Sequence, residues 1–223
     1  MSDVSPTAAD FDSDHGRIRV HRWSAAFADQ AAPDLVLLHP MPHDGLFFRT
    51  IAPLLAIGRT VIAPDYPGYG GSDGLEGTPT IGLYADAMID AIHSSQGPVD
   101  LFGFHTGCLV AVEMSLRYPG EVRRLVQVDV PYFDPAKRQE LMAGEFAVGG
   151  FIAAFSYAGE EHYPRVQHDC LVVATTSSLL EPSRAASAAI LGCRLQEMPE
   201  IHEPALENGA TVISRSTLKF LDN

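Results

Sequence analysis

The sequence predicts an α/β fold with a doubly wound, mostly parallel sheet that is covered by helices on both faces. Short, continuously apolar runs recur along the chain, and such runs are typical of strands buried on both faces. Segments with apolar residues at helical spacing separate most of these runs. Strands that alternate with helices favour a parallel arrangement, because each helix carries the chain back across the sheet.

The individual elements follow from these patterns in chain order. The predicted strands are residues 17–23, 34–39, 60–64, 99–102, 122–128, 170–174 and 194–198. The predicted helices are residues 47–57, 80–94, 106–118, 182–191 and 209–221. Thr80 is expected to cap the second helix, because a threonine hydroxyl at that position can accept a backbone N–H.

Two segments fall outside the alternation. Residues 1–16 are acidic and have little periodicity, so they read as a flexible tail before a single domain at 17–223. Residues 131–165 form a short insertion, which we expect to be a small lid over a small, fairly apolar substrate. The same apolar side chains could instead pack onto the sheet or form a homodimer contact. They are Phe146, Val148, Phe151, Ile152, Phe155 and Tyr157.

The composition limits the classes of partner. The chain has 223 residues with 28 acidic and 15 basic side chains, so its net charge is −13 and it would repel nucleic acid and anionic membranes. No apolar stretch is long enough to cross a bilayer, and the N-terminus does not resemble a secretory signal. The three cysteines suggest neither a disulfide framework nor a metal site. We therefore expect a cytoplasmic protein with reduced thiols that acts on a small molecule.

Three motifs carry the chemistry. Residues 103–107 read Gly-Phe-His-Thr-Gly between a predicted strand and a predicted helix, and the two glycines permit a tight turn that exposes His105. Residues 65–72 read Asp-Tyr-Pro-Gly-Tyr-Gly-Gly-Ser. The third motif is residues 35–45, in which a predicted strand runs into a loop through His39 and Pro40.

In this order and spacing, the three motifs resemble those of the α/β-hydrolase superfamily from about residue 17 to the C-terminus. The family pattern has a G-x-nucleophile-x-G elbow, a D-x-P-G-x-G-x-S loop and an oxyanion loop that usually reads His-Gly. The elbow usually holds serine, aspartate or cysteine, whereas this chain has His105 and is similar to a branch that carries the same histidine. An imidazole has no hydroxyl, so the acyl-serine mechanism cannot run through this position.

The resemblance implies further catalytic residues. His105 would be a nucleophile or general base, or would merely fill a degenerate pocket. His202 matches the family's catalytic histidine, and Ser178 stands at the position of the triad acid. Glu181 could substitute for that acid, and Asp129 matches an alternative acid site after the preceding strand. Asp129 could equally be a strand-end residue that binds nearby backbone.

The resemblance also implies an oxyanion hole made by the backbone N–H groups of Thr106 and Met41. His39 is expected to organise its loop, and His43 faces either the pocket or the solvent. We expect no metal, because the histidine spacing matches no known ligand pattern. We expect no cofactor, because in the near match to a dinucleotide fingerprint Asp73 replaces the third glycine.

These observations favour a hydrolase that acts on a small ester or similar acyl compound through a histidine-containing site. Two alternatives stay open. One is a cofactor-independent lyase that uses the same pocket for proton abstraction. The other is a binding protein of the same fold that has lost its catalytic triad.

Overall fold

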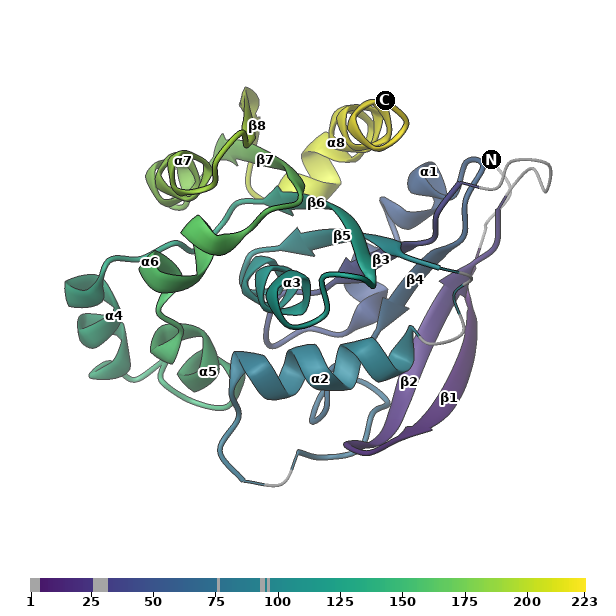
Figure 1. Cartoon of the computed structure of the whole chain (residues 1–223), viewed down its shortest axis with the longest axis horizontal. Coiled ribbons are helices and arrows are strands. Elements are labelled where there is room, and N and C mark those ends of the chain that lie inside the picture. The colour runs from purple at the N-terminus through teal and green to yellow at the C-terminus, as the bar shows by residue number, and fades with distance from the viewer. Residues whose placement is uncertain (1–4, 26–31, 76, 93–94, 96) are drawn as a thin grey trace.

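The computed structural model of the chain describes residues 5–25, 32–75, 77–92, 95 and 97–223. An eight-stranded sheet in the order β1-β2-β4-β3-β5-β6-β7-β8 forms its centre (Figure 1). The first three strands of that order pair antiparallel and all the others pair parallel, which confirms the predicted mostly parallel sheet. The strands are β1 Thr7–Ser13, β2 Gly16–Trp23, β3 Leu35–Leu38, β4 Val61–Pro64, β5 Val99–Phe104, β6 Val122–Val128, β7 Asp169–Thr176 and β8 Arg194–His202.

Helices cover both faces of this sheet (Figure 1). They are η1 Gly45–Phe48, α1 Ala52–Leu55, α2 Ile81–Ala91, α3 Thr106–Arg117, α4 Pro135–Met142, α5 Gly150–Ser156, α6 Gly159–His162, η2 Tyr163–Arg165, α7 Leu180–Ala189 and α8 Ala205–Leu221. Thr80 caps α2 as predicted, and its hydroxyl accepts the Leu83 N–H at 3.1 Å. The predicted end of that helix, at residue 94, lies outside the described residues. In the described part of the chain, no helix is long and apolar enough to cross a membrane.

The strands form two apolar cores because successive side chains point to opposite faces of a sheet. In β3, Val36 and Leu38 belong to the cluster under α2 and α3, which we call the first core. Leu35 and Leu37 belong to the cluster under α1 and α8, the second core. All four side chains are fully buried, which explains why this strand is apolar at every position.

The N-terminal segment is more ordered than the sequence predicts. Residues 7–13 were expected to lie in a flexible tail, but they form β1 and pair antiparallel with β2. Asp10 accepts hydrogen bonds from Arg17 at 2.9 Å and from Arg19, and Phe11 packs against the first core. The hairpin with β2 and the packing of Phe11 therefore order a segment whose own sequence has no clear strand pattern. Residues 1–4 lie outside the described part of the chain.

The insertion at 131–165 forms α4, α5, α6 and η2. Phe155 and Tyr157 are buried in the first core, so for these two side chains the packing alternative holds. Phe146 and Val148, by contrast, are 69% and 61% exposed. The insertion is fastened to the domain by the Tyr157 hydroxyl, which donates to Glu113 at 3.1 Å.

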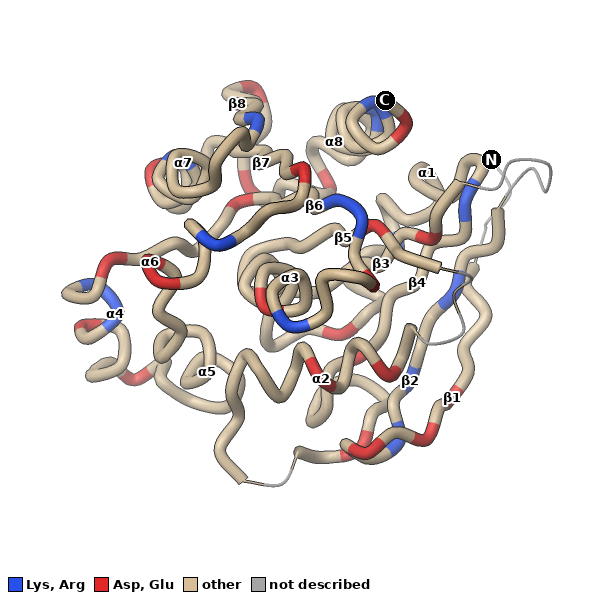
Figure 2. The backbone as a smooth tube through the Cα atoms, viewed as in Figure 1, with Lys and Arg blue, Asp and Glu red and all other residues tan. Residues whose placement is uncertain are grey.

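Basic and acidic residues are spread along the backbone over many elements (Figure 2). One acidic group is fully buried instead: Asp100 in β5 accepts hydrogen bonds from Arg59 at 3.0 Å and from Arg123 at 2.6 Å. Arg59 also binds Asp222, and Arg123 donates to the carbonyl of Leu221. This network ties the end of α8 to the amino-terminal edge of the parallel strands, opposite the edge where their carboxyl ends lie.

The loop after β4 is organised by a buried aspartate. The Asp65 carboxylate accepts hydrogen bonds from the N–H of Gly45 at 2.7 Å and of Gly71 at 2.8 Å, and contacts His21 Nε2 at 3.1 Å. Gly70 has a φ of +52° and lies so close that a methyl group there would overlap the Asp65 carboxylate. The aspartate and glycine of this motif are therefore required together.

We predict that Gly70→Ala destabilises the protein by about 2 kcal/mol or more, because the new methyl group meets the Asp65 carboxylate and disfavours the positive φ. Gly74→Ala is the matched control, since a methyl group there has open space, and it should stay within about 0.5 kcal/mol of wild type. Urea unfolding measures both values. Equal unfolding free energies for the two variants would contradict the contact between Gly70 and the Asp65 carboxylate.

Candidate active site

The turn between β5 and α3 has the predicted geometry. β5 ends at Phe104, α3 begins at Thr106, and His105 between them has a φ of +48°. A side chain at Gly103 would come within 2.7 Å of the Cys108 backbone, and one at Gly107 would overlap the Leu38 carbonyl. The two glycines thus allow α3 to begin directly against the sheet, and this raises His105 at the carboxyl end of β5.

His105 opens onto a cavity of about 340 Å³ beside α8. The walls are mainly apolar and aromatic, and the polar members of the lining are two histidines and two glutamates. In the described part of the chain, no residue of the 131–165 insertion lines this cavity. The expected lid over the substrate is therefore not found at this site. The lining residues are Pro40, Met41, His43, Phe47, Phe104, His105, Glu203, Pro204, Ala205, Leu206 and Glu207.

The His105 imidazole is uncharged at neutral pH. Burial lowers its pKa from 6.5 to about 4, and the charge of Glu203 only partly opposes this effect. The ring stacks on Phe104 with 4.2 Å between ring centroids. Its Nε2 atom is buried and has no hydrogen-bond partner among the described residues. A buried, unpartnered ring nitrogen costs free energy, and groups of this kind are found at functional sites.

One of the two expected oxyanion donors is already engaged. The Met41 N–H donates to the Thr106 hydroxyl oxygen at 2.7 Å, so in this structure it is not free for a substrate. This corrects the expectation for Met41, and the cause is the hydroxyl of the residue that follows His105. The Thr106 N–H lies at the first residue of α3, where a helix provides no acceptor for it. Thr106 itself is buried and is not among the residues that line the cavity, but its N–H and its hydroxyl proton both remain as donors next to His105.

His202 does not occupy the place that the sequence suggested. It is the last residue of β8, its side chain is exposed, and it does not line the cavity. The next residue, Glu203, lines the cavity instead, and its charge acts on His105. β8 ends at His202 and the chain bends at Glu203, so the two neighbouring residues have different surroundings.

The acid candidates also lie apart from His105. Asp129 is fully buried and accepts hydrogen bonds from the Thr175 N–H at 2.8 Å and the Thr175 hydroxyl at 2.6 Å. It therefore joins β6 to β7 as a strand-end residue, which was the alternative interpretation. Ser178 is exposed in the turn before α7, and Glu181 pairs with Arg184 at the surface. None of these three candidates lines the cavity.

The two histidines of the loop after β3 have different roles. His39 is fully buried, its Nδ1 contacts the Pro40 carbonyl at 3.1 Å and its Nε2 accepts the Tyr66 N–H at 3.1 Å. It organises the loop as predicted. His43 is exposed, lines the cavity and packs on Phe47 with 4.8 Å between ring centroids. It thus faces the pocket and the solvent at once.

Comparison with known proteins fixes the family. A sequence model of the α/β hydrolase fold matches residues 33–162, which is more than half of the chain. The chain belongs to the α/β-hydrolase fold family. It is 34% identical over 98 residues to a pimeloyl-[acyl-carrier protein] methyl ester esterase of Aromatoleum aromaticum, and the match covers 43% of this chain and 36% of that protein. The chain thus matches about a third of the length of the curated relatives.

Solved structures of this family agree in fold. A hydrolase of Pseudomonas aeruginosa PA01 superposes with a TM-score of 0.82 at 16% identity, over 97% of this chain and 99% of that one. The enol-lactonase of Burkholderia xenovorans LB400 superposes with a TM-score of 0.78 at 14% identity, over 96% and 100% of the two chains. At such identities the likeness establishes the shared fold.

Two functional candidates of this α/β-hydrolase site were missed in the sequence. Glu203 and Glu207 line the cavity, although neither was predicted from the sequence to belong to the site. Glu203 lies in the bend before α8 and Glu207 in its first turn, and no pattern in the sequence marked either residue as part of the site. In the described part of the chain, no group of three or more His, Cys, Asp or Glu residues is arranged to hold a metal ion.

We predict that the two low-pKa histidines make the protein sensitive to acid. His39 and His105 have pKa values of about 4 in the fold, against 6.5 ordinarily. The unfolded chain therefore takes up protons between about pH 6.5 and 4 that the folded chain does not. Above about pH 6.5 each neutral histidine contributes about 3 kcal/mol to the free energy of unfolding. This contribution is lost as the pH falls from about 6.5 to about 4.

His105→Gln should remove one of these two contributions, so its unfolding free energy should fall less steeply below about pH 6.5 than that of wild type. Phe47→Leu is a control from the same cavity wall, because it changes packing but not titration. The plot of its unfolding free energy against pH should run parallel to that of the wild-type protein. Urea unfolding at a series of pH values measures the free energy of unfolding of the wild-type protein and both variants. If this free energy depends on pH with the same slope in wild type and His105→Gln, the low pKa assigned to His105 is wrong.

Proposed function

We propose that the protein hydrolyses small, neutral esters or related acyl compounds, with His105 as the general base that activates water. The observation that carries this proposal is the buried, unpartnered Nε2 atom of an uncharged imidazole beside the cavity. A neutral imidazole can accept a proton, and the elbow is the position from which this family acts on its substrate. The related esterase and the similar enol-lactonase structure support an ester-like substrate class.

The cavity suggests what the substrate looks like. Phe47 and Phe104 provide an aromatic wall, with 5.3 Å between their ring centroids. Glu203 and Glu207 are the charged members of the lining, and the described lining includes no lysine or arginine. A carboxylate-bearing substrate would meet like charge there, whereas a neutral acyl group would bury apolar surface against the aromatic rings.

The proposed reaction uses three groups of this chain. Water lies between His105 Nε2 and the substrate carbonyl, and Nε2 takes a proton from water as the oxygen attacks. The Thr106 hydroxyl, which accepts the Met41 N–H, keeps its proton and donates a hydrogen bond to the carbonyl oxygen as negative charge develops there. The imidazolium is stabilised by the charge of Glu203 and then returns the proton to the leaving alcohol. The products are one carboxylic acid and one alcohol.

A lyase that abstracts a proton from carbon is the second candidate. The observation that favours it is the engaged Met41 N–H, because acyl transfer in this family uses two backbone donors whereas proton abstraction needs a base and one donor. Exchange of substrate hydrogen for deuterium in D₂O, without hydrolysis, distinguishes the two reactions by NMR.

We predict that His105→Gln lowers hydrolysis of a small neutral aryl ester by about a hundredfold or more, because a general base of this kind contributes about 10²–10⁴ in rate. Glu203→Gln should lower it by about tenfold, since a carboxylate no longer stabilises the imidazolium. His168 directly precedes β7, contacts the Pro119 carbonyl at 3.2 Å and does not line the cavity, so His168→Gln is the control and should keep wild-type activity.

His202→Gln provides the decisive comparison, because His202 matches the family's catalytic histidine in sequence but does not line the cavity. The proposal expects nearly full activity from this variant. Loss of activity in His202→Gln with retention in His105→Gln would overturn it. Circular dichroism of each variant confirms that the fold is intact before rates are compared.

We also predict that a fluorophosphonate, which labels activated serines, leaves every serine of this protein unmodified, because a histidine stands at the elbow. A serine esterase of the same fold, treated in the same vessel, is the positive control. Labelling is mapped by mass spectrometry of the intact protein and its peptides. Stoichiometric modification of any serine would show that a different nucleophile operates.

A further inference from the structure

Two cysteines that the proposed site does not use lie opposite each other on neighbouring strands. Cys170 belongs to β7, and Cys193 immediately precedes β8. The register pairs Leu171 with Arg194, so the two residues one position earlier are also opposite each other. Adjacent strands lie about 4.8 Å apart, which is within the range of about 4.4–6.8 Å that a disulfide spans between its Cα atoms.

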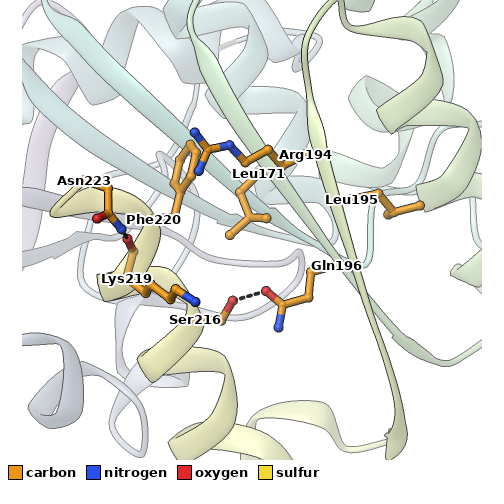
Figure 3. Close-up of a pocket in the computed structure, with 8 residues that line it drawn as sticks. All are labelled: Leu171, Arg194, Leu195, Gln196, Ser216, Lys219, Phe220 and Asn223. Carbon is orange, nitrogen blue, oxygen red and sulfur yellow. Dashed lines mark hydrogen bonds between the residues drawn. The ribbon is translucent and has the colours of Figure 1, made fainter.

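Both thiols lie on the same face of the sheet. Cys170 is part of the first core, and Cys193 packs against that core. Leu171 and Arg194, the next residues along each strand, instead line a cavity of about 300 Å³ beside α8 on the opposite face (Figure 3). Because side chains alternate along a strand, the two sulfur atoms meet on the side that α7 covers.

The pair is chemically asymmetric. The Cys193 thiol is partly exposed and hydrogen-bonded to Cys170, and it has further hydrogen bonds to Ser187 and to the Val172 backbone. The bond with Cys170 is the main reason why the pKa of Cys193 falls to about 7, although burial opposes it. A substantial part of Cys193 is therefore thiolate at neutral pH, and the thiolate is the nucleophilic form.

Cys170 is suited to the complementary role. It is buried, and its sulfur also accepts a hydrogen bond from Gln127 Nε2 at 3.3 Å. The hydrogen bond with Cys193 and the burial raise the pKa of Cys170 well above its ordinary value. Cys170 is thus a protonated thiol that is held against its neighbour, within reach of any sulfur species that forms on Cys193.

We propose that Cys170 and Cys193 form a redox-active dithiol that reacts with hydroperoxides and closes to a disulfide. Cys193 is the attacking residue and Cys170 is the resolving residue. The proposal does not depend on the hydrolytic function of the His105 cavity, because the pair lies at the opposite end of β8 from Glu203.

The reaction proceeds in two balanced steps. The Cys193 sulfur attacks one peroxide oxygen, the S–O bond forms as the O–O bond breaks, and the other oxygen leaves as an alcohol after it gains a proton. Cys193 is then a sulfenic acid. The Cys170 sulfur attacks the Cys193 sulfur, the S–S bond forms as the S–O bond breaks, and the leaving hydroxide takes the Cys170 proton as water. Two thiols are oxidised, and one hydroperoxide is reduced to an alcohol and water.

Peptide mapping of the peroxide-treated full chain tests the proposal. Cleavage after arginine separates the cysteines, because Cys170 falls in peptide 166–184, Cys193 in 185–194 and Cys108 in 60–117. Hydrogen peroxide should join the first two peptides by a disulfide that dithiothreitol releases. Alkylation of the untreated protein with iodoacetamide should modify Cys193 at least on the order of tenfold faster than the buried Cys108.

Two variants separate the roles of the pair. Cys170→Ser should stop the reaction at a sulfenic acid on Cys193, which dimedone traps, and Cys193→Ser should leave Cys170 unmodified. Cys108→Ser is the matched control and should form the same disulfide as wild type. If peroxide leaves peptides 166–184 and 185–194 unlinked in the wild-type protein, or joins them only between two copies of the chain, the proposal is wrong.

Discussion

The site depends on one tight turn, in which β5 passes into α3 through His105. In this turn His105 has a positive φ although it is not a glycine, and Gly107 lies so close to the Leu38 carbonyl that a side chain there would overlap it. The contact aligns the start of α3 with the loop after β3. As a consequence, the side chain at the centre of the turn, the N–H groups at the start of α3 and the Met41 backbone converge at one edge of the sheet.

The same turn places a histidine where a serine enzyme of the same fold has its nucleophile, and this is the basis of the proposed mechanism. The elbow raises an imidazole into a largely apolar cavity, where burial keeps it neutral and leaves Nε2 unpartnered. Next to it, the Thr106 hydroxyl accepts the Met41 N–H, which a substrate oxyanion would otherwise accept. The two features are linked, because His105 and Thr106 are consecutive residues of the same turn. Together they favour a base and a hydroxyl donor over a nucleophile and two backbone donors.

Much of the fold could be predicted from local patterns, and the exceptions have physical causes. The buried strands, the glycine-flanked elbow and the Thr80 cap depend on periodicity and backbone geometry, which the sequence records directly. The order of residues 7–13 depends on their pairing with β2 and on the packing of Phe11 against the first core, so no periodicity within the segment itself revealed it. Glu203 rather than His202 lines the cavity because β8 ends at His202 and the chain bends immediately after it, and the sequence does not show where the strand ends. The bond between Met41 and Thr106 joins residues far apart in sequence, and only the folded chain brings them together.

The central claim is that His105 is a neutral imidazole whose free ring nitrogen meets the substrate. NMR of the protein with ¹⁵N-labelled histidine side chains tests it directly, with the His105 signals assigned by their loss in His105→Gln. The account predicts that the His105 ring stays neutral down to about pH 5, and that a non-hydrolysable ketone analogue of a small neutral ester shifts its Nε2 signal. An imidazole that titrates near its ordinary pKa of about 6.5, and whose signals do not respond to the analogue, would contradict the account.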